Sequence, residues 1–390
     1  MAAQERKEKR SQGRYMASMK SDTERFLENN SRHLERMRMS ITGRIAFLFP
    51  GLRKLYNEYA DTDTTEKKAL ACARVLNAYE ESFIWRARHC FWIFTENIRV
   101  LRQQKGFRNR AIDHSDKTAK DYYSVAVIVK NEARYIREFI LFYEATGADR
   151  IYIYDNDSTD TLLDVLRPFL ERGLVVYRYL HGPNVQTFAY RDVVRRTKHR
   201  TKWLAVIDAD EFLFSPKGCM PEQLRAYEDY PGVGANWVLF GPCGHKTRPD
   251  GLIEDNYTET FADKDIEVNR HIKSIVQPSK VFSFFHTHFP IYKGRLYAVN
   301  ENGDTIDNYC AYSEGAGRAF TENNNREIFR INHYFTKSLE ELKEKCERGY
   351  ADGAPGRKYE EVLQMFDAPL IRDCTIKPYA DSIREEYYCR

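Results

Sequence analysis

The stretch Lys202-Trp-Leu-Ala-Val-Ile-Asp-Ala-Asp-Glu-Phe212 decides the fold, because an apolar run ends there in a group of acidic residues. A short, continuous apolar run of this kind is typical of a strand that is buried on both faces. Asp208 and Asp210 are separated by one residue, so in an extended segment both carboxylates point the same way. Two such carboxylates repel each other unless a cation lies between them. The stretch therefore predicts a cation site at the end of a buried strand.

Upstream of this stretch, short apolar runs alternate with segments of helical periodicity. The expected strands are residues 125–129, 151–154, 174–177 and 203–207, and the expected helices contain residues 136–143, 162–169 and 186–198. Ser158 or Thr159 is expected to cap the second helix. Strands and helices that alternate at this spacing predict an α/β fold, with a mostly parallel sheet and helices on both of its faces.

Polar residues follow three of the four expected strands. They are Lys130-Asn131-Glu132, Asp155-Asn156-Asp157 and Asp208-Ala209-Asp210. Ligands of parallel sheets gather at the carboxyl ends of the strands. Carboxylate oxygens completed by phosphate oxygens suit Mg²⁺ or Mn²⁺. The acidic residues after the second strand can accept hydrogen bonds from a ribose or a base N–H, although they also suit a turn that starts a helix.

The composition narrows the class of protein. The chain has 390 residues and a net charge of +4, but residues 1–120 hold 25 Lys and Arg against 15 Asp and Glu. This basic front predicts contact with an anionic surface, with a solvated helical face as the alternative. An aromatic, amphipathic pattern at residues 65–104 suits packing on a catalytic domain, a membrane surface or an oligomer contact. No aromatic platform or binding motif accompanies the charge, so nucleic acid is not an expected partner.

The sequence also carries expectations about the compartment. The eight cysteines include no CxxC pair, which favours thiols in a reducing compartment over a disulfide framework. No run of roughly 18 apolar residues occurs and the start resembles no signal peptide. The expected location is therefore cytoplasmic, with peripheral contact to the inner face of the membrane through residues 1–120.

Several blocks resemble glycosyltransferase family 92 and its bacterial family-2-like relatives. The resemblance covers about residues 124–350 in the expected order. It is carried by Val129-Lys-Asn-Glu-Ala133, Tyr152-Ile-Tyr-Asp-Asn156, Ser158-Thr-Asp160 and residues 202–212, and further by Phe240-Gly-Pro-Cys-Gly-His245, Arg248-Pro-Asp-Gly251, Lys273-Ser-Ile-Val276 and Ile331-Asn-His-Tyr-Phe-Thr-Lys-Ser338. The resemblance implies a GT-A fold and a metal-dependent hexosyltransferase. It implies transfer from a UDP-sugar donor to a glycan or lipid-linked glycan acceptor, with inversion, in cell-surface polysaccharide or glycan synthesis.

The resemblance also implies roles for particular residues. The implied nucleotide-sugar contacts are Lys130, Asn131, Glu132, Asp155, Asp157, Gln186, Tyr190 and Asp208. Asp208 and Asp210 would bind Mn²⁺ or Mg²⁺, and among His286, His288 and His333 the last lies in the block that best matches the family. Lys273, Arg270 and Lys337-Ser338 are candidate diphosphate contacts. Arg191 departs from the family pattern, in which asparagine is usual, and this puts the donor sugar in doubt.

An inverting transfer needs a base that takes the proton of the acceptor hydroxyl. Glu254 aligns best with the family's acidic residue, Asp255 comes second, and Asp250 is a third carboxylate in the same segment.

Two other function classes remain open beside this one. A metal-dependent nucleotidyltransferase usually has a glycine-rich loop after the first strand, which Val129-Lys-Asn-Glu-Ala133 lacks. The other class is a non-catalytic relative that binds a nucleotide sugar or a glycan. For all of these function classes we expect three segments. They are a basic, mostly helical extension at 1–120, a catalytic domain at 121–350 and a helical tail at 351–390.

Overall fold

A computed structural model describes residues 50–61, 111–116, 118, 120–183, 185–284, 286–293, 296–306, 319–348 and 358–389. The chain divides into two compact units, residues 1–104 with 309–317 and residues 105–308 with 318–390. In the first unit the described element is the helix α3 (Pro50–Ala60). The helical pattern expected at residues 65–104 lies outside the described residues. No helix in the described part of the chain combines the length and the apolar character needed to cross a membrane.

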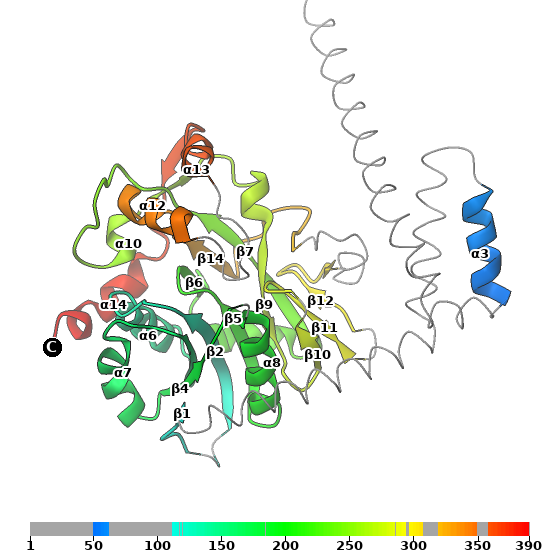
Figure 1. The fold of residues 1–390 in the computed structure, drawn as a ribbon, viewed down its shortest axis with the longest axis horizontal. Coiled ribbons are helices and arrows are strands. Elements are labelled where there is room, and N and C mark those ends of the chain that lie inside the picture. The colour runs from blue at the N-terminus through cyan, green and yellow to red at the C-terminus, as the bar shows by residue number, and fades with distance from the viewer. Residues whose placement is uncertain are drawn as a thin grey trace, which may run out of the picture. The chain divides into compact units, whose positions relative to one another are not determined.

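The second unit is built around a mixed sheet in which four neighbouring strands are parallel (Figure 1). Its strands β2 (Asp121–Val129), β3 (Arg150–Asn156), β4 (Val175–Leu180) and β5 (Thr201–Ile207) lie in the order β4-β3-β2-β5. The helices α6 (Ile136–Ala145), α7 (Leu162–Glu171) and α8 (Gln186–Thr197) connect them. This confirms the α/β class, the parallel strands and the GT-A type of architecture. The four strands and three helices expected between residues 125 and 207 each lie within a few residues of their predicted places.

Successive side chains of β2 belong to different sides of the sheet, as the strand pleat requires. Val125 and Val127 pack in one core cluster with Phe139 of α6. Ala126, between them in sequence, packs in a second cluster with Tyr190 of α8. The continuous apolar runs of the strands therefore reflect burial on both faces.

The other half of the sheet departs from the parallel pattern. β9 (Ile272–Val276) pairs antiparallel with β5 and with β7 (Gly232–Leu239). β14 (Arg330–His333) pairs parallel with β7 and antiparallel with β6 (Glu211–Phe214). Further elements of this unit are α9 (Met220–Leu224), α10 (Ile253–Asn256), β8 (Glu259–Phe261), β10 (Val281–Phe284), β11 (Pro290–Tyr292), β12 (Ala298–Val299), β13 (Thr305–Ile306), α12 (Leu339–Arg348), α13 (Tyr359–Met365), β15 (Leu370–Arg372) and α14 (Lys377–Tyr388).

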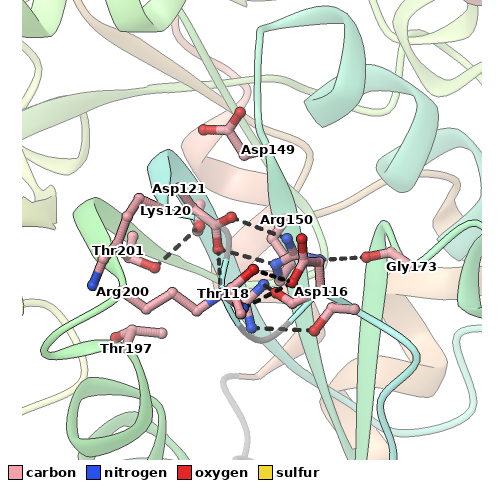
Figure 2. A network of polar contacts seen from close by, with 12 residues as sticks. Asp116, Thr118, Lys120, Asp121, Asp149, Arg150, Gly173, Thr197, Arg200 and Thr201 are labelled. Atoms are coloured by element: carbon pink, nitrogen blue, oxygen red, sulfur yellow. Dashed lines mark hydrogen bonds and ion pairs between the residues drawn. The ribbon is translucent and has the colours of Figure 1, made fainter.

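A buried ion network fastens the amino-terminal ends of the parallel strands (Figure 2). The Asp121 carboxylate accepts hydrogen bonds from Nε and Nη2 of Arg150, both at 3.0 Å, and from Nε of Arg200 at 3.1 Å. Both guanidinium groups also reach main-chain oxygens, of Gly173 and of Asp116. The carboxylate and the two guanidinium groups satisfy one another and main-chain oxygens, so we interpret the network as structural. The opposite edge of the sheet carries the candidate site.

Two local expectations need correction or extension. The predicted helix cap at Ser158 or Thr159 is wrong, because α7 begins at Leu162 and its N–H is accepted by Asp160 Oδ1 at 3.2 Å. Within the stretch 105–121, which is polar and basic, β1 (Ala111–Ile112) pairs antiparallel with β4.

The carboxyl-terminal elements pack on the sheet and its helices. β15 pairs antiparallel with β8, and α14 packs on α6 (Figure 1). Ile376, Ala380 and Ile383 belong to the same core cluster as the strands.

Candidate active site

The strand register brings the predicted polar segments to one edge of the sheet. Val129 of β2 lies opposite Asp155 of β3, and Val127 lies opposite Ile207, the last residue of β5. The segments that follow β2, β3 and β5 therefore leave the sheet side by side. The expected clustering of these polar residues is found.

The segments after β2 and β3 are joined by hydrogen bonds around Asn131. Asn131 has a φ of 58°, a left-handed conformation that asparagine adopts more readily than most residues. Its N–H donates to Ser158 Oγ at 2.9 Å, and its side-chain oxygen accepts the N–H of Thr159 at 2.7 Å. Asn131 thus shapes the loop, and Ser158 serves this contact instead of capping α7.

Asp155 and Asp157 are held by groups from β4 and the turn after it. The Asp155 carboxylate accepts the Tyr177 hydroxyl at 2.7 Å and the N–H of Ser158 at 2.8 Å. Asp157 accepts the Tyr179 hydroxyl at 2.5 Å and the N–H of Gly182 at 3.0 Å. Burial alone would raise the pKa of Asp157, but these donors lower it to about 2. Asp157 is therefore an anion under all ordinary conditions.

The Asp208 carboxylate is held on both of its oxygens. Oδ1 accepts a hydrogen bond from Gln186 Nε2 at 3.0 Å and from the Tyr190 hydroxyl at 3.1 Å. Oδ2 accepts one from Lys273 Nζ at 2.7 Å. Gln186 and Tyr190 lie one turn apart on α8, so their side chains share a face of the helix and reach the same oxygen. About a third of the Asp208 side chain, 33%, is still exposed.

Lys273 is a fully buried lysine with two acidic neighbours. Besides Asp208, its Nζ lies 3.7 Å from Glu211 Oε2, and that oxygen accepts the N–H of Asp208 at 2.9 Å. Burial raises the pKa of Glu211 to about 8, although Lys273 opposes this effect. Burial would lower the pKa of Lys273, but Asp208 and Glu211 raise it. The lysine is therefore a built-in counter-charge for Asp208.

Asp210 is bound by residues from the far end of the domain. The strands β6 and β14 place Glu211 opposite His333, which brings the histidine to the acidic segment. His333 Nε2 lies 3.6 Å from Asp210 Oδ1, and Lys345 Nζ lies 2.5 Å from Oδ2. Burial would raise the pKa of Asp210, but Lys345 and His333 hold it well below its ordinary value. Asp210 is therefore also an anion.

The chemistry of these donors fits a divalent cation. Asp208 and Asp210 supply carboxylate oxygens, and burial lowers the pKa of His333, which keeps its imidazole in the neutral form that binds metals. His333 Nδ1 is buried and has no hydrogen-bond partner. Among the described residues, no three His, Cys, Asp or Glu side chains are gathered tightly enough to hold a metal ion. In their present arrangement, ammonium groups neutralise the two aspartates.

His288 and His333 both contact Trp237, and His286 lies beside His288. The ring centroid of Trp237 is 4.3 Å from that of His333 and 5.2 Å from that of His288. His288 Nδ1 lies 2.8 Å from the carbonyl oxygen of Ile272, and His286 Nδ1 accepts the N–H of His288 at 3.2 Å. Of these three histidines, His333 has a ring nitrogen 3.6 Å from Asp210 Oδ1.

The two predicted bases, Glu254 and Asp255, lie on α10. Glu254 is 4% exposed and Glu138 of α6 is fully buried, and this burial raises the pKa of both carboxyls. Glu138 Oε1 accepts the N–H of Ile253 at 2.6 Å. The Asp255 side chain is 32% exposed and pairs with both terminal nitrogens of Arg384, at 2.5 and 3.0 Å.

The remaining candidates are exposed or pair with neighbouring residues. Lys130 is exposed, and Glu132 lies 4.0 Å from Lys337, whose Nζ stands 4.0 Å from the ring centre of Tyr135. Arg270 donates to the carbonyl oxygen of Glu322 at 3.3 Å, and Asp250 pairs with Arg134 at 3.5 Å.

Sequence reasoning missed Lys345, Glu138 and Arg384. Each of them lies on an element that is distant in the chain from the predicted site residue with which it interacts. No local sequence pattern marks these positions.

Comparisons with known proteins agree with the sequence blocks. The family model described as "Glycosyltransferase family 92" matches residues 122–348. A family 92 protein of Oryza sativa subsp. japonica is 30% identical over 197 residues, which cover 48% of this chain and 33% of the relative. One of Arabidopsis thaliana is 26% identical over 173 residues, covering 41% and 29%. The chain thus spans about a third of the length of these relatives.

Solved structures give a fainter likeness. S. aureus TarS in complex with UDP is 12% identical, covers 40% of this chain and 47% of its own, and has a TM-score of 0.29. The mannosyltransferase PcManGT from Pyrobaculum calidifontis, in complex with GDP-Man and Mn²⁺, is 21% identical, covers 38% and 44%, and has a TM-score of 0.24. Similarity at this level supports no argument about function.

The family match spans more than half of the chain and includes every residue described above at the strand ends, from Lys130 to Lys345. On this evidence the chain belongs to glycosyltransferase family 92.

Proposed function

We propose that this protein is a metal-dependent glycosyltransferase that transfers a sugar from a UDP-sugar to a glycan acceptor, with inversion at the anomeric carbon. The proposed setting is the synthesis of a cell-surface polysaccharide or another glycan, with a lipid-linked glycan as one form of the acceptor. Glycosyl transfer from a nucleotide sugar needs a site for an anionic diphosphate. The family blocks hold the residues that we propose for this site.

One observation carries the proposal. Asp208 and Asp210 stand at the carboxyl end of β5, next to the polar ends of β2 and β3, and Lys273, Lys345 and His333 surround them. A parallel sheet offers its ligand site at this edge. Both aspartates are exposed in part, with 33% and 16% of their side chains accessible, so a ligand can reach them.

The protein groups divide the work on the donor. Gln186, Tyr190 and Lys273 fix the Asp208 carboxylate, and the β6–β14 pairing fixes His333 beside Asp210. Asp208, Asp210 and His333 would hold Mn²⁺ or Mg²⁺. A bound divalent cation neutralises the negative charge that develops on a departing nucleoside diphosphate. Asp155 and Asp157 are proposed as nucleoside contacts beside it.

For the acceptor side we propose Asp255 or Glu254 as the base. Exposure supports Asp255, because Arg384 orients a carboxylate that solvent can reach, whereas both carboxyl oxygens of Glu254 are buried. Replacing Asp255 with Asn should abolish turnover and leave UDP affinity unchanged. The role passes to Glu254 if Glu254→Gln shows this loss while Asp255→Asn stays active.

The central test is a screen of UDP-sugars with Mn²⁺, in which hydrolysis and binding are measured for the wild type and for Asp210→Ala. We expect Asp210→Ala to lose turnover and metal-dependent nucleotide binding. Asp164→Ala, a change at an exposed aspartate of α7, is the matched control and should behave as the wild type. Nucleotide binding that is independent of metal and unchanged in Asp210→Ala would contradict the assignment.

We also propose that the basic residues 1–120 bring the protein to an anionic membrane surface on the cytoplasmic side. The support is the excess of ten basic residues in this stretch, since anionic lipid attracts such clusters. The test is flotation of the full chain with vesicles of neutral lipid, with and without phosphatidylserine. Equal flotation with both vesicles would overturn this proposal and leave the proposed chemistry untouched.

A further inference from the structure

Lys345 holds the Asp210 carboxylate from outside the sheet. The lysine lies on α12, 135 positions from Asp210 in the chain. Its Nζ donates to Asp210 Oδ2 at 2.5 Å and to the carbonyl oxygen of Phe335 at 3.2 Å, and it stands 3.8 Å from the centre of the Phe335 ring. The ammonium group thus satisfies one oxygen of a carboxylate that the proposed function assigns to a metal.

Lys273 and Lys345 contact the two aspartates, and they differ in how easily they can be displaced from them. The Lys273 side chain is 0% exposed, inside the sheet, and its ammonium contacts both Asp208 and Glu211. The Lys345 side chain is 28% exposed, on a helix at the surface, and a rotation of its side chain can carry its ammonium into solvent. Lys273 is therefore a permanent counter-charge, whereas Lys345 can be displaced.

We infer that Lys345 competes with the divalent cation for Asp210. Its ammonium pairs with the carboxylate, and an incoming metal must displace it from Oδ2. This inference rests on the proposed metal-dependent function. Under it, Lys345 sets the metal concentration at which the site is filled. Lys345 also keeps Asp210 from standing uncompensated in a largely buried position before the metal arrives.

The physical basis is charge. With Asp208 and Asp210 ionised, Lys273 and Lys345 already bring the pair to neutrality, so a divalent ion added beside both lysines meets a site with no net attraction. Once Lys345 leaves, the site keeps one negative charge, and the repulsion between ammonium and metal is removed. A divalent ion and an ammonium a few ångströms apart in a water-accessible site repel each other enough to weaken binding roughly tenfold to thirtyfold.

The experiment measures Mn²⁺ binding without nucleotide, from the electron paramagnetic resonance signal of the free hydrated ion. Lys345→Met should bind Mn²⁺ roughly tenfold or more tightly than the wild type, since the competing charge is gone. Lys345→Arg keeps the charge and should bind weakly, as the wild type does. Lys343→Met, at an exposed lysine of the same helix, is the control for a general change in surface charge.

Thermal unfolding gives a second readout, which also checks that the variants fold. Without metal, Lys345→Met should melt below the wild type, and Mn²⁺ should raise its Tm by more than it raises that of the wild type. Equal Mn²⁺ affinity in the wild type and Lys345→Met, or weaker affinity in the variant, would overturn the inference alone. Absence of Mn²⁺ binding in every variant would overturn both the inference and the proposed metal site.

Discussion

At the scale of single residues, the site depends on Lys273. This lysine is the kind of group that folding normally keeps at the surface, and its burial is offset by two acidic partners. Lys273→Met keeps the volume of the side chain but leaves Asp208 without its counter-charge. We expect a loss of about 3 kcal/mol in the free energy of unfolding, at the low end for a broken buried pair because Asp208 is partly exposed. Urea denaturation measures it, with the exposed Lys217→Met as the control.

An unchanged urea midpoint in Lys273→Met would mean that the lysine contributes little to holding the acidic segment. In that case Gln186 and Tyr190 would be the main supports of Asp208, and Tyr190→Phe would be the more damaging change.

The buried carboxyls of Glu138 and Glu254 make a prediction about pH. Burial raises the pKa of both groups above the ordinary 4.5 in the folded state. A carboxyl whose pKa is higher in the folded protein than in the unfolded chain stabilises the fold fully at a pH below its unfolded pKa. This contribution is lost as the pH rises through the pKa of the folded state. Glu138→Gln keeps the oxygen that accepts the Ile253 N–H but cannot ionise, so its stability should fall less toward high pH.

The difference between Glu138→Gln and the wild type is therefore expected to grow in favour of the variant as the pH rises from 5.5 to 9. Glu211, with a pKa of about 8, titrates in the same direction in both proteins and cancels from the difference. Urea unfolding across this range measures the effect, and Glu171→Gln on the exposed side of α7 is the control. A constant difference across the range would show that Glu138 is not the titrating group.

At the scale of elements, the loops after β2 and β3 act as one unit joined at Asn131. Asn131→Ala removes the side-chain oxygen that accepts the Thr159 N–H. It also places alanine, which tolerates the left-handed region less well than asparagine, at a φ of 58°. Asn131→Gly loses the hydrogen bond but accepts the backbone conformation. We expect losses of about 2 kcal/mol for Ala and about 1 kcal/mol for Gly, measured by thermal unfolding. Equal losses would show that backbone strain contributes nothing.

The strands and helices of the parallel half could be predicted because their signals are local. Val125 and Val127 belong to an apolar run, and Phe139 and Tyr143 recur at helical spacing, so each element is marked within its own sequence. The same holds for the acidic segment Asp208–Glu211. The antiparallel pairing of β9 and the return of β14 between β6 and β7 could not be predicted, since pairing between distant strands depends on contacts that no window of sequence contains.

The candidate site follows the same division between local and distant signals. Asn131, Asp155 and Asp208 stand directly after predicted strands and were found from their position. Lys345 lies on a polar surface helix, where a lysine is ordinary, and its role becomes visible only when α12 packs beside Asp210. Ser158 was expected to cap a helix, but a loop partner, Asn131, takes its hydroxyl instead.

At the scale of the whole molecule, the question is whether the segment beyond the family match folds with the catalytic unit. Residues 358–389 lie outside the matched residues 122–348, yet α14 buries Ile383 in the core cluster of the sheet. Arg137 of α6 donates to the main-chain oxygens of Glu386 and Cys389, and Arg384 holds Asp255 on α10. These contacts indicate that α14 supports both α6 and the segment that carries the proposed base.

Replacing Ile383 with Ala tests this coupling without deleting the segment. If α14 folds as part of the unit, loss of this buried side chain should cost about 2–4 kcal/mol and lower the urea midpoint of the entire far-UV transition, since one cooperative core is weakened. Ser382→Ala changes a neighbouring exposed position and should leave the midpoint within error. If α14 folds as a separate tail, Ile383→Ala would leave the midpoint of the main unfolding transition unchanged. It would add only a small unfolding step at low urea concentration. In that case Asp255 would lose the support of Arg384 without any loss of stability in the sheet, and turnover in Arg384→Ala would fall while its urea midpoint stayed unchanged.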